Sequence, residues 1–141
     1  MDEKKPTITK NEYELLSEFR YALRKFLSFS KEEALNVGLT PQQHQALLTI
    51  KGSEDLSDSV TIGQLAERLQ IHHNSAVGLV DRLVERGLVE RSHKEDDRRK
   101  VYISLTDKGN ELLQKLTEVH KKELKRIGPE LNHLIQHITN E

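Results

Sequence analysis

The chain has 141 residues, of which 35% are hydrophobic and 32% are charged, and it contains no cysteine. This length suits one compact domain, so we expect residues 1–141 to form a single domain. The lack of cysteine excludes disulfides, thiolate metal sites and cysteine nucleophiles. A net charge of −1 excludes a global attraction to nucleic acid, so any such binding depends on where the charges are placed.

The hydropathy pattern excludes a membrane span. No apolar run reaches the length of about 18 residues that a transmembrane helix needs, and Met1–Lys5 leads into polar sequence rather than a signal core. We therefore expect a cytoplasmic protein with no membrane partner. The low hydrophobic content favours helices with a narrow apolar stripe and a subunit partner that covers further apolar surface.

The first part of the chain predicts two helices. Thr9 and Glu12 have the spacing of a capping box, and apolar residues follow at helical spacing over residues 11–36. This long amphipathic helix contains five of the six aromatic residues. After Gly38, the pair Thr40 and Pro41 begins a second helix that runs to about residue 51. Residues 52–59 form an acidic, turn-rich loop.

The middle of the chain predicts two short helices that lie close together. Thr61 and Gln64 form another capping box and open a helix over residues 61–69. A second helix follows over 73–86, after only three residues, and Gly87 ends it. Helices this close must cross sharply. The residues expected on the buried side of the second helix are Ala76, Leu79, Val80 and Leu83.

A β-hairpin and further helical sequence complete the chain. Residues 88–91 and 101–105 alternate as short strands, which predicts a hairpin over 88–105. Residues 91–100, around its tip, contain five basic and three acidic side chains, a net charge of +2. Helical sequence follows over 106–141, with Pro129 expected to begin a last, separate helix.

A helix, a short turn, a second helix and a hairpin form the winged helix-turn-helix arrangement, which predicts a mainly α fold with a small β wing. Residues 40–105 would be the DNA-binding part. Asparagine and serine can read base edges, arginine can hold guanine or phosphate, and a basic tip suits the minor groove. The expected DNA-binding residues are His73, Asn74, Ser75, Val77, Gly78, Arg82, Arg98, Arg99 and Lys100.

Several motifs in this part resemble the MarR (multiple antibiotic resistance regulator) family of bacterial repressors. They are Leu65-Ala66-Glu-Arg-Leu69, Leu79-Val-Asp81-Arg-Leu83, Gly87-Leu-Val-Glu-Arg91, Asp97-Arg98-Arg99 and Leu105-Thr-Asp-Lys-Gly109. The order of the flanking helices is also similar. The resemblance implies a ligand-responsive repressor in which the helices over 11–36 and 106–141 interlock as a homodimer on a pseudo-palindromic operator.

The same resemblance implies roles for two charged residues. Arg99 would enter the minor groove, and Asp81 would pair with it and orient the wing. The sequence departs from the family at two positions. His72 stands where serine commonly caps the recognition helix, and we expect His72 and His73 to share that task. Gly78 stands where an arginine commonly faces the DNA.

Other residues allow more than one interpretation. Phe19, Phe26 and His44 either wall a pocket for an aromatic or phenolic effector, as the resemblance implies, or belong to the core or dimer interface. Glu130, His133 and His137 share one helical face and suit zinc, but an exposed polar face is the simpler interpretation. We expect no cofactor, although a metal-responsive member of the family is an alternative.

The chain carries no sequence signature of an enzyme: it has no nucleophile elbow, phosphate loop or zinc-protease motif. We therefore expect no catalytic activity and no catalytic residues. The alternative to a DNA-binding regulator is a winged helix that binds proteins without specific DNA binding. The near-neutral net charge favours that alternative, and salt dependence of DNA binding separates the two.

Overall fold

The computed structural model of the protein describes residues 6–53, 59–94 and 97–140. The residue contacts divide the chain into two compact units. One contains the residues up to Ser30 together with those from Val119 onward, and the other is Lys31–Glu118. Helices α1 (Lys10–Asn36) and α5 (Asp107–Thr139) each contribute to both units.

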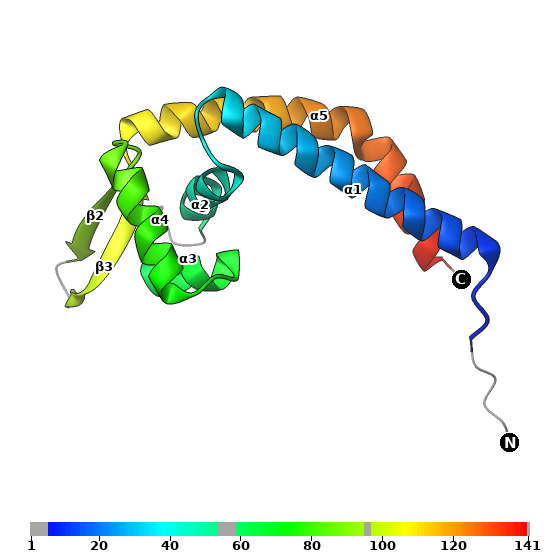
Figure 1. Cartoon of the computed structure of the whole chain (residues 1–141), viewed down its shortest axis with the longest axis horizontal. Coiled ribbons are helices and arrows are strands. Elements are labelled where there is room, and N and C mark those ends of the chain that lie inside the picture. The colour runs from blue at the N-terminus through cyan, green and yellow to red at the C-terminus, as the bar shows by residue number, and fades with distance from the viewer. Residues whose placement is uncertain (1–5, 54–58, 95–96, 141) are drawn as a thin grey trace, which may run out of the picture. The chain divides into compact units, whose positions relative to one another are not determined.

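The unit Lys31–Glu118 is the winged helix-turn-helix part, and Figure 1 shows α3 and α4 beside the β2–β3 hairpin. The predicted fold class is confirmed, and the predicted ends of the four helices before the wing differ from the observed ones by one residue at most. The elements between α1 and α5 are α2 (Pro41–Lys51), β1 (Ser59–Thr61), α3 (Ile62–Leu69), α4 (His73–Glu85), β2 (Val89–Lys94) and β3 (Asp97–Leu105).

Capping residues set the ends of these helices. At the start of α2 the Thr40 hydroxyl accepts from the Gln43 N–H at 3.1 Å, and Gln43 Oε1 accepts from the Thr40 N–H at 3.0 Å. Thr61 and Gln64 form the same reciprocal pair at the start of α3. Gly38 and Gly87 end α1 and α4 in the left-handed conformation, with φ of 80° and 70°. The capping signals in the sequence are therefore confirmed as helix boundaries.

The sheet contains a third strand, at the junction of the predicted loop over 52–59 and the predicted helix from residue 61. Strand β1 pairs antiparallel with β3, with Val60 opposite Ile103, and the strand order is β1-β3-β2. Three residues are too few to show a period of two, so the strand was not predicted. Val60 and Ile103 are both buried, and their burial in the core makes this short strand part of the wing sheet.

One hydrophobic core holds the winged unit together. Helix α4 directs Ala76, Leu79, Val80 and Leu83 inward, as predicted, and α3 contributes Leu65. The first turns of α5 contribute Leu113 and Leu116 to the same core. This shared burial fixes α4 against its neighbours and leaves its opposite face for solvent or a partner.

The other unit pairs the first part of α1 with the last part of α5 (Figure 1). His120 Nε2 lies 2.7 Å from the Ser30 hydroxyl, and its ring meets those of Phe26 and Phe29 edge-on. Among the described residues of this unit, only two apolar side chains, Ala22 and Leu134, are buried. Its exposed large apolar side chains are Ile8, Tyr13, Leu16, Tyr21, Leu23, Leu27, Leu124 and Ile135.

The expectation that Pro129 begins a separate helix is wrong, because α5 continues through it from Asp107 to Thr139. An internal proline removes one backbone hydrogen bond and costs about 3 kcal/mol. The apolar spacing continues across the proline, from Leu124 to Leu131 and Leu134, and Leu134 is buried. Packing along this stripe therefore favours one continuous helix over a break. No helix in the described ranges is long and apolar enough to cross a membrane.

Candidate nucleic-acid interface

The outward face of α4 carries the predicted recognition residues. The side chains of His73, Asn74, Ser75 and Arg82 are exposed, while Val77 and Gly78 are half-buried. The buried stripe lies on the opposite side of the helix. The helix therefore presents hydrogen-bonding and cationic groups on its outward side, a chemistry that suits base edges and phosphates.

The start of α4 differs from the expectation. His72 occupies the N-cap position but its side chain makes no capping hydrogen bond, so the prediction that it caps the helix is wrong. Its carbonyl oxygen still accepts from the Ala76 N–H at 3.0 Å. Without a side-chain cap, the N–H groups of the first turn stay available to an anion, and the helix dipole favours one there.

The wing places basic residues on β3. Arg99 and Lys100 are exposed, and the Lys100 carbonyl oxygen lies 3.2 Å from His93 Nδ1 on β2. The side chain of Arg98 lies outside the described part of the structure. The exposed guanidinium and ammonium groups are well suited to phosphate contacts.

Asp81 forms an ion pair with Arg91 of β2. The pair of Asp81 with Arg99 that the resemblance implies stays a prediction. The side chains of Arg91 and Asp81 are 38% and 54% exposed. Arg91 follows Gly87 after only four residues, and α4 packs against β2, so the root of the wing lies within reach of the acid. Arg91 was predicted only as one of the basic residues around the tip, so this pairing was not predicted. The position of Arg91 shortly after the helix-ending glycine was the available signal.

Gly78 has open space around it. A Cβ atom built on Gly78 would meet no atom within 4 Å, outside the backbone of its own helix. Packing among the described residues therefore does not require glycine at this position. By contrast, a Cβ on Gly109 would overlap the carbonyl oxygen of Leu88.

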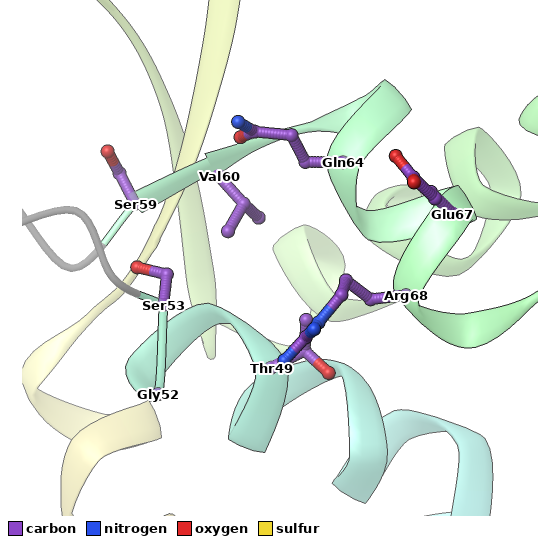
Figure 2. A pocket seen from close by; sticks show the side chains of 8 residues that line it. All are labelled: Thr49, Gly52, Ser53, Ser59, Val60, Gln64, Glu67 and Arg68. Carbon is purple, nitrogen blue, oxygen red and sulfur yellow. The ribbon is translucent and has the colours of Figure 1, made fainter.

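The residues expected to line an effector pocket are distributed over both units. Phe19 and Phe26 belong to the unit that contains the start of α1, whereas His44 is buried in the winged unit. Figure 2 shows a different pocket of about 300 Å³, at the end of α2 beside β1 and α3. Its described lining has no aromatic side chain and consists of Thr49, Gly52, Ser53, Ser59, Val60, Gln64, Glu67 and Arg68. The aromatic effector pocket stays a prediction.

Of the candidate metal residues, His133 and His137 lie in contact with each other. The rings of His133 and His137 meet edge-on with centroids 4.0 Å apart. Within the described ranges, no three histidine, aspartate or glutamate side chains form a group that could hold a metal ion, and Glu130 does not complete one.

The described elements define a winged helix-turn-helix protein, with α3 and α4 as the two helices and the β1-β3-β2 sheet as the wing. Residues 37–100 match the model of the MarR family. Over these residues the chain is similar to proteins of that family.

Individual proteins are also similar to this chain in sequence or in fold. The chain is 29% identical over 101 residues to the transcriptional repressor MdtR of Bacillus subtilis, covering 69% of this chain and 63% of MdtR. The chain thus covers less than two thirds of this curated relative. A MarR family protein from Bacillus stearothermophilus has a similar fold, with a TM-score of 0.76, 23% identity, and coverage of 96% of this chain and 100% of that one.

A third comparison is with a DNA complex. A variant of MepR from Staphylococcus aureus bound to an oligodeoxyribonucleotide has a TM-score of 0.67 and 19% identity, with 93% of each chain covered. At this identity the likeness concerns the fold.

Proposed function

We propose that this protein is a transcriptional regulator that binds a pseudo-palindromic DNA operator as a homodimer. The observation that carries the proposal is the outward face of α4, where Asn74, Ser75 and Arg82 are exposed beside a wing with exposed Arg99 and Lys100. A protein with a similar fold has been solved bound to an oligodeoxyribonucleotide, which supports DNA binding by this fold. The protein would act as a repressor, which is also the printed role of MdtR, and in the cytoplasm.

The homodimer is supported by the unit that pairs the start of α1 with the end of α5. Two buried apolar side chains are too few to hold two helices together in water, and the large apolar side chains on the same segments are exposed. A second copy of these helices would cover those side chains. Two-fold symmetry then predicts two half-sites about one helical turn, roughly 10 bp, apart.

The test is fluorescence anisotropy of the purified protein on the DNA upstream of its own coding region, with random duplex as competitor and at two salt concentrations. We expect binding that survives the competitor and weakens steeply as salt rises, through counterion release. Binding to no duplex, or binding without salt dependence, would contradict the proposal and favour a winged helix that docks onto proteins.

We further propose that a small aromatic or phenolic effector releases the DNA. An effector that binds one conformation of the dimer better than another would change the spacing of the two recognition helices, so that both no longer fit the groove together. The expected result is a compound in a phenolic screen that lowers operator affinity. Unchanged affinity at saturating concentrations across the screen would contradict this part.

A further inference from the structure

Arg86 lies at the end of α4. Its side chain contacts the end of α1 and the start of α2. It is the C-cap residue of α4, and its Nη1 donates a hydrogen bond to the carbonyl oxygen of Gly38. The same nitrogen lies 3.5 Å from Gln43 Oε1. Gly38 ends α1 and Gln43 belongs to the first turn of α2, so one guanidinium connects the end of α4 to both helices.

The acceptors that Arg86 uses are themselves held in place. Gly38 has a left-handed φ of 80°, and the Leu39 N–H after it donates to the Ala34 carbonyl at 2.8 Å. Gln43 is only 8% exposed and already accepts from the Thr40 N–H in the capping box of α2. The guanidinium therefore binds two fixed groups, which restricts its own position.

The main chain at the same point is tied to the start of α5. Lys108 Nζ donates to the Arg86 carbonyl oxygen at 3.1 Å, and the Thr106 hydroxyl donates to the Gly87 carbonyl oxygen at 2.6 Å. The Thr106 N–H also donates to the Leu88 carbonyl oxygen at 3.0 Å. The carbonyl groups of the three residues after α4 are thus hydrogen-bonded to residues at the start of α5.

These bonds add directional constraints on α4 to the packing of its buried face. The buried contacts of Leu79, Val80 and Leu83 are apolar, whereas hydrogen bonds are strongly directional. The start of α4 has no side-chain cap to hold it. The directional contacts of the helix are therefore concentrated at the end that carries Arg86.

We propose that Arg86 is a positioning residue for operator reading, which sets the angle at which α4 presents Asn74 and Ser75. Arg86 is 12 residues from Asn74, about 18 Å along the helix, so its effect acts through the direction of α4. The hydrogen bonds at Arg86 connect α4 to α1 and α5. In the proposed dimer, α1 and α5 would set the distance between the two recognition helices. This inference rests on the proposed function.

The test compares Arg86→Gln with Lys115→Gln, which removes one positive charge from an exposed position on α5 in the same unit. The first measurement needs no DNA. Hydrogen exchange of the amides in residues 34–44 should be faster in Arg86→Gln than in the control, because these helix ends lose the guanidinium. Equal exchange in the two variants would overturn the proposal.

The second measurement uses an operator selected from random duplexes by the wild-type protein, and derivatives in which the half-sites are moved by one or two base pairs. We expect Arg86→Gln to lose about tenfold affinity for the selected spacing, the loss typical of one charge-assisted hydrogen bond. Its affinity for random duplex should stay that of the control, and its preference among spacings should become flatter.

An equal loss on operator and random duplex would overturn the proposal, since it would mean only a smaller folded fraction. Circular dichroism melts check the folded fraction, and Arg86→Lys, which keeps the charge but not the planar fork, replaces Arg86→Gln if that variant unfolds. If the wild type selects no operator, the proposed function fails, while the exchange measurement still decides whether Arg86 holds the helix ends.

Discussion

Asp81, which forms an ion pair with Arg91, places a carboxylate on the helix face that we propose binds DNA. An acid there is repelled by phosphate, so its presence is best explained by its hold on the root of the wing. Asp81→Asn should change the free energy of unfolding by less than about 1 kcal/mol, because the pair is largely exposed. Chemical denaturation measures this.

In binding, the same substitution should raise affinity for random duplex and lower the ratio of specific to non-specific affinity. The first effect follows from the lost repulsion and the second from a wing that is held less firmly. Competition titrations with operator and random duplex measure both. An unchanged ratio would show that Asp81 is only a solvated surface acid.

Arg99→Ala should weaken binding to every duplex to a similar extent. The guanidinium is exposed on β3, and a phosphate or minor-groove contact carries little sequence information. The slope of log affinity against log salt should fall by about one for each subunit bound. Anisotropy titrations over a salt series measure it, with a thermal melt as the folding control; an unaltered slope would contradict the role of Arg99.

Asn74→Ala should act at one base position. Its exposed amide lies in the first turn of α4, and loss of a bidentate base contact costs about 1 to 3 kcal/mol. Affinities for operators with each base pair varied in turn should show relaxed preference at one position in each half-site. If Asn74→Ala and Arg99→Ala act alike on random DNA, the division of roles between helix and wing is wrong.

At the residue scale, the sequence predicted which side chains are exposed but not which of them pair. Helical spacing was enough to separate Leu79 and Leu83 from Asn74 and Ser75, because burial follows a period of 3.6. The partner of Asp81 depends on where β2 leaves the end of α4. That direction is a tertiary property, which local spacing does not encode.

At the scale of elements, a substitution of Gly78 tests whether the backbone of α4 closely approaches the DNA. Gly78→Ala should raise the free energy of unfolding by about 1 kcal/mol, since a Cβ there meets no atom outside the backbone of its own helix. Operator affinity should fall if the backbone approaches the groove at this point. Denaturation and anisotropy on the same preparation measure both.

Gly109→Ala is the matched comparison for that measurement. Its Cβ would overlap the Leu88 carbonyl oxygen where α5 begins, so we expect lower stability instead. Higher stability together with unaltered operator affinity for Gly78→Ala would mean that the glycine has no role in binding.

The elements themselves were largely predictable because their boundaries are local. Capping boxes at Thr40 and Thr61 and left-handed glycines at 38 and 87 act within four residues of chain. Strand β1 and the continuity of α5 through Pro129 were not predicted. Both depend on burial against residues distant in sequence, as the pairing of Val60 with Ile103 illustrates.

At the scale of the whole molecule, the exposed apolar residues of α1 predict the oligomeric state. Leu27 is 58% exposed, and Leu27→Glu would place a charge in the proposed dimer interface. We expect a monomer in sedimentation velocity and loss of operator binding. Leu48→Glu on α2, where the leucine is 47% exposed, is the control and should leave the dimer intact. Dimers in both variants would contradict the proposed interface.

The sequence by itself determined the winged helix-turn-helix class, the boundaries of α1 to α4 and the exposed polar face of α4, because each depends on local spacing and capping. Only the tertiary structure decided the pairing of Asp81 with Arg91, the third strand of the wing and the convergence of Gly38, Gln43 and Lys108 on Arg86. These features join residues that are 10 to 48 positions apart in the chain. Their geometry follows from how the core packs, which local periodicity does not encode.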